Sequence, residues 1–337
     1  MSTLFATNRV FKQGPTPRQG DTLILPRAVD FELSNNQAEQ SIYFCDRLNQ
    51  DNYQEIGSWE FFRRLDEDTA TDILFYIHGY SSLPEPAAFR RTQELQQLFE
   101  LTDRSRKVLV IPLIWPCDND LGLVKDYFDD QKAADASDMS FMRFFEKFFQ
   151  WLRERIQPGN APFTKKLHVL TQSMGARVLV GAISRAVYYY QTAGFPQIFS
   201  NVFMAAPDIV NEALEFGQSG QHLPGATQNL IIYHAADDWA LTASIAANIF
   251  GLVASKRLGQ KGPENFERIP DNVFAFNCSD FNNTYDRLAG HRYFGALPNQ
   301  PTQPGLLFRH MQLCIERQQV IIPIGSRTAT LEPQLWS

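Results

Sequence analysis

The chain has 337 residues, of which 44% are hydrophobic and 20% are charged, and its formal net charge at pH 7 is −6. A chain of this length and composition can bury a large core, which argues against global disorder. The acidic balance argues against a nucleic-acid partner, because such proteins need a basic surface.

The cysteines and the N-terminal sequence indicate in which cellular compartment the protein is expected. The four cysteines lack the close spacings of a zinc site or a disulfide framework, so we expect reduced thiols and a cytoplasmic location. The N-terminus lacks the apolar core of a signal peptide, and no run of about eighteen apolar residues predicts a membrane span. No phosphate-binding glycine loop or dinucleotide fingerprint occurs, so we expect no cofactor.

Residues 1–70 predict edge strands that lead into the main sheet of the same domain. The β-like stretches there are TLILPRAVDFELS and SIYFCDRL. Both stretches are rich in β-branched and aromatic residues, which favour strands.

From residue 71 to 295, short apolar segments alternate with helical patterns. The apolar segments are Ile73–Gly79, Val108–Trp115, Leu167–Ser173, Asn201–Pro207, Asn229–Ala235 and Asn272–Cys278. The helical patterns are Glu85–Leu101, Asp138–Ile156, Met174–Tyr190, Val210–Phe216 and Trp239–Leu258. Continuous apolar runs are typical of strands covered on both faces. The alternation therefore predicts an α/β fold with a mostly parallel central sheet and helices on both faces.

Two segments interrupt or follow this pattern. Residues 118–137 are acidic and predict a lid or a partly helical insertion. Its acidic residues are Asp118, Asp120, Asp126, Asp129 and Asp130, whose spacing does not match a calcium loop, so we expect a solvated segment and no metal site. Residues 296–337 predict a helix over Gly305–Arg317 and a docked tail.

The phenylalanine-rich pattern at Phe141–Leu152 gathers its large apolar residues on one helical face. A helix lying on a membrane surface has a similar pattern. We favour packing against the sheet, because the neighbouring strands need a cover.

A serine stands where one strand meets a helix. The stretch Thr171-Gln172-Ser173-Met174-Gly175 resembles the G-x-S-x-G turn that exposes a nucleophilic serine, with Thr171 in place of the first glycine. The pentapeptide alone is equally compatible with a helix-capping serine.

Acids and a histidine follow the other strand ends. Asp208 follows one strand, Asp237 and Asp238 follow the next, and His291 comes after the last. This is the serine–acid–histidine order of an α/β-hydrolase triad. The histidine would take the serine proton, and a buried carboxylate would orient the histidine. The backbone amides of Tyr80 and Met174 are the expected oxyanion donors.

The motifs HGYSS, SMG, AAPD, DWAL and GHRYF, with ATNR near the start, resemble the α/β-hydrolase superfamily. The resemblance is to a branch of bacterial-type hydrolases of unknown function. It implies Ser173 as nucleophile, Asp238 as acid and His291 as base. Asp208 and Asp237 remain alternative acids.

The other histidines have different expected roles. His78 is expected to fix the oxyanion loop, and His168 and His234 lie inside strands and are expected to be buried and neutral. His310 is the fallback base, although its helical pattern favours a surface position.

The expected function is hydrolysis of a carboxylic ester or a related acyl bond of a small molecule, through an acyl-serine intermediate. Two alternatives stay open. One is a catalytically silent scaffold that binds a small molecule or a protein, and the other is an acyltransferase that uses the same triad.

Overall fold

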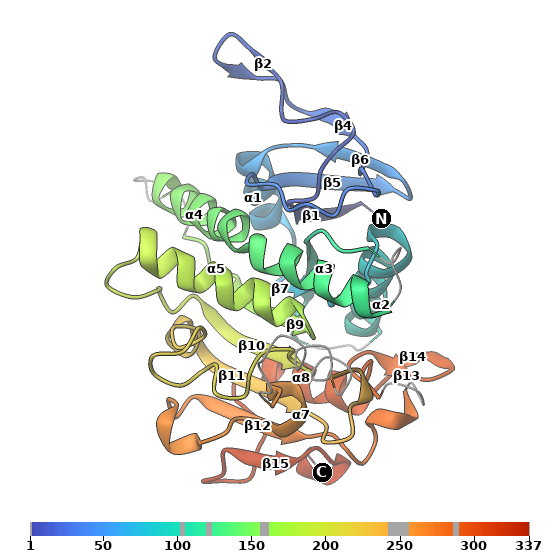
Figure 1. Ribbon diagram of the computed structural model, residues 1–337, viewed down its shortest axis with the longest axis vertical. Helices are drawn as coiled ribbons and strands as arrows, with labels where there is room; N and C mark the ends of the chain where they lie inside the picture. Colours follow the sequence, from blue (N-terminus) through green and yellow to red (C-terminus); the bar gives the residue numbers. More distant parts are fainter. Residues whose placement is uncertain are drawn as a thin grey trace.

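The computed structural model describes residues 2–101, 105–118, 123–155, 162–241, 256–285 and 290–336. An 11-stranded sheet runs through the molecule in the order β15-β12-β11-β10-β9-β7-β8-β1-β5-β6-β4 (Figure 1). Its six central strands are β7 (Asp72–Ile77), β8 (Val108–Ile114), β9 (Lys166–Gln172), β10 (Phe199–Ala205), β11 (Thr227–His234) and β12 (Val273–Asn277). These strands are parallel and confirm the six predicted segments.

Strands from both ends of the chain extend this sheet. The N-terminal ones are β1 (Thr3–Thr7), β4 (Arg27–Val29), β5 (Tyr43–Asn49) and β6 (Asn52–Glu55), and the C-terminal one is β15 (Thr328–Thr330). β1 lies parallel to β8, whereas β5, β6 and β4 continue the sheet in antiparallel pairs. Two small hairpins are separate: β2 (Arg18–Gln19) with β3 (Thr22–Leu23), and β13 (Ala296–Leu297) with β14 (Gln300–Pro304).

Helices cover both faces of the sheet, as the sequence predicted. The described helices are α1 (Ser58–Glu67), α2 (Arg90–Glu100) after the π-turn Pro84–Phe89, α3 (Leu123–Ala136), α4 (Asp138–Arg155), α5 (Gly175–Tyr189), α7 (Leu258–Lys261) and α8 (Leu306–Arg317). Successive residues of β7 point to opposite faces. Ile73 and Phe75 join the core formed with α1, α4 and α5, whereas Leu74 and Tyr76 join the core formed with α2 and α8.

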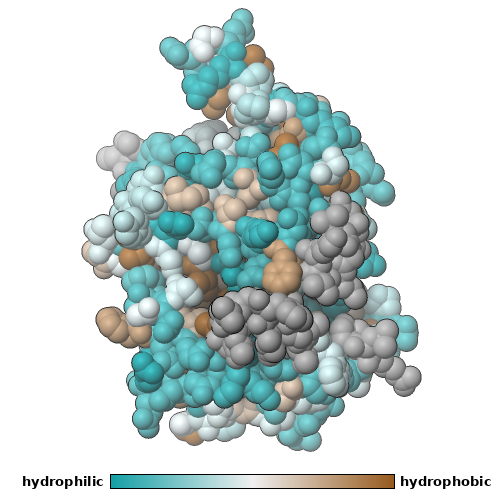
Figure 2. Space-filling model, viewed as in Figure 1, coloured by the Kyte–Doolittle hydropathy of each residue, from teal (hydrophilic) through white to brown (hydrophobic). Residues whose placement is uncertain are grey.

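The phenylalanine-rich helix is a core helix. Phe141, Phe144, Phe145 and Phe148 of α4 are all buried, as expected. Among the described residues, no helix is long and apolar enough to cross a membrane. The face in Figure 2 is mostly hydrophilic with dispersed hydrophobic residues, which is ordinary for a protein surface.

One predicted helix is wrong, and one lies largely outside the described part. Val210–Phe216 forms turns, with Val210 bridged to Arg257 and the Asn211 amide bonded to the Lys256 carbonyl. Seven residues are too few to form a stable helix alone, and here their backbone groups find partners in another segment. Most of Trp239–Leu258 falls in residues 242–255, outside the described residues.

His310 is buried, so its expected surface position is wrong. The Tyr233 hydroxyl lies 2.7 Å from His310 Nδ1, and the Ile321 carbonyl oxygen lies 2.8 Å from His310 Nε2. A carbonyl can only accept, so Nε2 carries the proton and Nδ1 accepts from the tyrosine. The apolar environment that α8 forms on the sheet keeps this imidazole neutral, and burial lowers its pKa to about 4.

This histidine makes stability depend on pH. An imidazole in the unfolded chain has a pKa of about 6.5. Between about pH 6.5 and 4 the unfolded chain therefore binds a proton that the folded chain does not, and stability falls as the pH falls through this window. We predict that the melting temperature of His310→Gln falls less steeply than that of the wild type from pH 7 to 4.5. Scanning calorimetry checks this, and parallel pH curves for the two proteins would contradict it.

Candidate active site

Ser173 occupies a strained turn between β9 and α5. Its φ is 52°, in the left-handed region that non-glycine residues rarely adopt. Its amide donates to the Ala205 carbonyl at 2.9 Å, and its carbonyl accepts from the Asp208 amide at 3.0 Å. The N-cap of α5 is Met174 and not Ser173, so the capping alternative does not describe this serine. Hydrogen bonds to the neighbouring backbone thus hold Ser173 in this strained conformation.

Two glycines let the adjoining loop reach this turn. A side-chain carbon at Gly175 would lie 2.5 Å from the Ile77 oxygen and 2.6 Å from the His78 oxygen. At Gly79 it would lie 3.2 Å from the Ser173 Cβ. The start of α5 and the loop after β7 therefore pack directly on one another.

His78 orients that loop, as the sequence predicted. Its Nδ1 lies 2.9 Å from the Gly79 oxygen, and its Nε2 accepts from the Trp115 amide at 3.2 Å. Nδ1 therefore carries the proton, and complete burial lowers the His78 pKa to about 4, so the ring is neutral at physiological pH. The peptide from Gly79 to Tyr80 is trans, so the Tyr80 N–H points away from His78.

His291 and Asp238 are in direct contact. Nδ1 of His291 lies 2.7 Å from Oδ2 of Asp238, and the other carboxylate oxygen accepts from the Leu241 amide at 3.1 Å. Asp238 is fully buried, and His291 is only 6% exposed. Gly290 precedes the histidine at φ 60°, and a side-chain carbon there would lie 2.5 Å from the Asn283 Oδ1, so both the backbone conformation and the space favour glycine at this position.

The two alternative acids have other partners. Asp208 is buried, accepts from the Tyr127 hydroxyl at 2.7 Å, and lies 3.2 Å from Arg257 Nε. Asp237 accepts from the Asn283 side-chain amide. Of the three candidate carboxylates, the structure brings Asp238 against His291.

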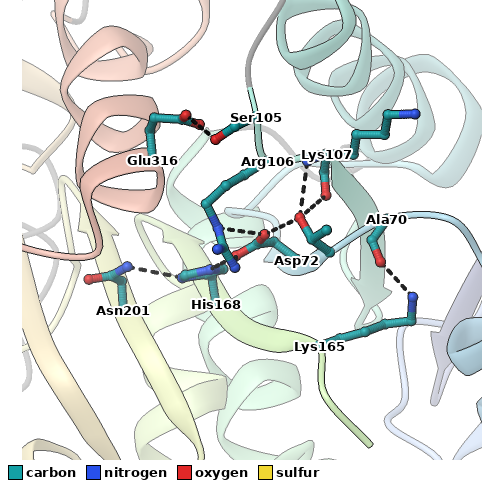
Figure 3. Close-up of polar contacts among 10 residues, drawn as sticks. Ala70, Asp72, Ser105, Arg106, Lys107, Lys165, His168, Asn201 and Glu316 are labelled. Atoms are coloured by element: carbon teal, nitrogen blue, oxygen red, sulfur yellow. Dashed lines mark hydrogen bonds and ion pairs between the residues drawn. The ribbon is translucent and has the colours of Figure 1, made fainter.

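A second histidine–aspartate pair lies elsewhere and has a different environment. His168 Nε2 is 3.0 Å from Asp72, and the Asn201 amide donates to its Nδ1 at 3.0 Å (Figure 3). Arg106 also binds Asp72. Both ring nitrogens are thus engaged near the amino ends of the strands, and burial lowers the pKa of His168. His168 is therefore a buried, neutral imidazole in a structural network, as expected for a histidine inside a strand.

The acidic segment 118–137 is helical from residue 123 and is not a solvated loop. Asp118, Asp126 and Asp130 are buried, which contradicts the solvated interpretation, whereas Asp120 lies outside the described residues. No group of metal-ligating side chains occurs among the residues that the structure describes. The sequence analysis did not predict the contacts of Asp130 with the Ser81 amide or of Tyr127 with Asp208. The four-residue spacing of Asp126 and Asp130, which places both on one side of a helix, is the one signal for them.

Comparison with known families gives one match. A family model described as an alpha/beta hydrolase of unknown function (DUF900) matches residues 55–301. This range contains Ser173, Asp238 and His291. No curated protein matches the chain.

The close contact at Gly175 gives a direct test of the turn. In an ordinary helix, alanine is more stable than glycine by about 0.5–1 kcal/mol. We predict the opposite for Gly175→Ala, because the added carbon meets backbone oxygens of β7 and of His78: the free energy of unfolding should fall by roughly 1–3 kcal/mol. Gly225→Ala is the matched control, since that position has open space around it. Equal urea midpoints for the two variants would show that the added carbon at Gly175 does not destabilise the fold.

Proposed function

The chain belongs to a family of α/β hydrolases, and from that premise we propose that it is a serine hydrolase that cleaves a carboxylic ester or a related acyl bond. The observation that carries the proposal is the 2.7 Å contact between His291 Nδ1 and the buried Asp238 carboxylate. The left-handed conformation of Ser173 supports it, because nucleophilic serines of this fold occupy such a turn.

Ser173 Oγ attacks the acyl carbon, and His291 Nε2 takes the hydroxyl proton. Asp238 accepts a hydrogen bond from Nδ1–H, which keeps the proton on Nδ1 and leaves the lone pair on Nε2, the nitrogen that acts as base. The same carboxylate stabilises the imidazolium that forms. His291 then protonates the departing alcohol, and the acyl-serine remains. Water attacks this ester with His291 again as base, which releases the acid and restores the serine.

The Tyr80 and Met174 amides bind the oxyanion of the tetrahedral intermediate. Met174 lies at the N-terminus of α5, where the amides have no intrahelical acceptor and the helix dipole favours negative charge. The Tyr80 amide is aimed by His78 through the trans peptide at Gly79. Donors that are fixed before the reaction stabilise the transition state most, because they need no reorganisation.

Covalent labelling tests the proposed function. A fluorophosphonate should add one mass increment to the wild type, on Ser173, and none to Ser173→Ala. Ser184→Ala is the matched control: that serine lies on α5, and its hydroxyl donates to the Ser219 carbonyl. Intact-protein and peptide mass spectrometry read the result. A folded wild type that takes no label would indicate a silent scaffold, and labelling that persists in Ser173→Ala would place the nucleophile elsewhere.

The acid has its own test. Asp238→Asn should lower kcat for an activated ester by about four orders of magnitude, as the comparable change does in a serine protease, because the amide favours the wrong imidazole tautomer. Asp237→Asn, one residue away, should keep near wild-type kcat, since that side chain contacts Asn283. If Asp208→Asn loses activity and Asp238→Asn keeps it, the acid is Asp208, after the end of β10.

A further inference from the structure

Helix α3 contacts the loop that carries the Tyr80 amide and the residue that binds the Ser173 backbone. Its Asp130 accepts from the Ser81 amide in the loop after β7. Its Tyr127 donates to Asp208, whose amide binds the Ser173 carbonyl. Building on the proposed function, we propose that Asp130 is a positioning residue of the reaction, whose carboxylate fixes the peptide after Tyr80 and so keeps the Tyr80 amide aimed at the oxyanion.

The Asp130 carboxylate is fully buried and accepts three hydrogen bonds. Oδ2 accepts from the Ser81 amide at 2.7 Å. Oδ1 accepts from the Asn36 side-chain amide at 2.9 Å and from the Asp118 amide at 3.1 Å. The carboxylate therefore ties α3 to the loop after β7 and to the end of the segment after β8.

These bonds fix two successive peptides around Tyr80. The peptide before it is held by His78, which binds the Gly79 oxygen. The peptide after it is held at both ends: the Ser81 amide binds Asp130, and the Tyr80 carbonyl accepts from Ser82 Oγ at 3.2 Å. Ser81 itself is left-handed, with φ 55°, a conformation that persists only where its surroundings enforce it. The direction of the Tyr80 N–H is thus set from both sides.

The other donor is supported from the same helix. The Tyr127 hydroxyl donates to Asp208 at 2.7 Å, and the Asp208 amide donates to the Ser173 carbonyl at 3.0 Å. The Tyr127 ring also meets the Tyr80 ring edge-on, with centroids 6.1 Å apart. One helix therefore links the Tyr80 loop to the turn that presents the Met174 amide.

The chain keeps an ionisable group at Asp130 in spite of its cost. Burial is the main cause that raises the Asp130 pKa to about 7; the nearby Asp118 carboxylate acts in the same direction, and the hydrogen bonds from Ser81, Asn36 and Asp118 act against it. Arg9, also fully buried, lies close enough to favour the charged forms of these acids and donates to the Cys117 carbonyl at 2.6 Å. A buried carboxylate that only filled space would be replaced at lower cost by an apolar side chain.

The isosteric variant Asp130→Asn removes the relevant bond with little change of volume. An asparagine has one acceptor oxygen, whereas three N–H donors face the two oxygens of Asp130. If the asparagine oxygen faces the Asn36 and Asp118 donors, its NH₂ group faces the Ser81 N–H, so the bond to Ser81 is lost. Asp129→Asn is the matched control: Asp129 accepts from the same Asn36 amide at 3.0 Å, and its carboxylate makes no bond to Ser81.

The experiment measures the rate of fluorophosphonate addition to the full chain, separated into kinact and KI. Removing one oxyanion donor outright costs about 10²–10³ in rate. A donor that is kept but poorly aimed should cost less, so we expect kinact of Asp130→Asn to fall roughly 10- to 100-fold, with KI within about twofold. Asp129→Asn should keep the wild-type kinact. Equal kinact values for the two variants, or an effect on KI alone, would overturn the proposal.

The melting temperature of Asp130→Asn shows whether this variant folds. If it does not fold, a second variant tests the proposal. Ser82→Ala removes the hydroxyl that holds the carbonyl end of the same Tyr80–Ser81 peptide, and kinact should again fall with KI unchanged. A wild-type kinact in this variant would then overturn the proposal. A wild type that takes no label on Ser173 overturns both this inference and the proposed function, whereas a labelled wild type beside an unaffected Asp130→Asn overturns this inference alone.

Discussion

The arrangement of the site depends on the left-handed backbone of Ser173. This conformation is costly for a residue with a side chain, by about 1–3 kcal/mol. It persists because Ala205 at the end of β10 accepts from the Ser173 amide and the Asp208 amide donates to the Ser173 carbonyl. The parallel register of β9 and β10 delivers the Ala205 carbonyl at that point. Close contact also requires Gly175 and Gly79, since any side chain at Gly175 would meet the backbone of β7 and His78. The conformation of the candidate nucleophile therefore depends on the sheet as well as on the glycines near it in the sequence.

The two histidine–aspartate pairs show how position decides chemistry. His168 and Asp72 lie near the amino ends of their strands, where Asn201 and Arg106 complete a closed network. His291 and Asp238 follow the carboxyl ends of β12 and β11, the edge where ligands bind in open α/β sheets. The same two side-chain types thus act as a structural link at one edge and as the proposed base and acid at the other.

Much of the fold could be predicted because continuous apolar runs report strands buried on both faces. All six central strands were found in this way, and the residues at their ends suggested the site. The sequence left Asp208 and Asp237 open as alternatives to Asp238, because all three follow strand ends, and their contacts are what favour Asp238 as the proposed acid. The burial of Asp130 and His310 was not predicted, for a related reason. Polar residues on a helix are expected to be exposed unless their hydrogen-bond partners, which here come from distant segments, are known.

In the proposed site, the Ser173 hydroxyl faces two backbone donors, the Tyr80 and Met174 amides, that are positioned before substrate binds. The most direct measurement is a crystal structure of the protein after phosphonylation by a fluorophosphonate, whose phosphonyl oxygen mimics the oxyanion. We expect phosphorus bonded to Ser173 Oγ, with the phosphonyl oxygen roughly 2.7–3.1 Å from the Tyr80 and Met174 amide nitrogens. A phosphonyl oxygen that points away from both amides, with the loop after β7 unchanged, would contradict this expectation.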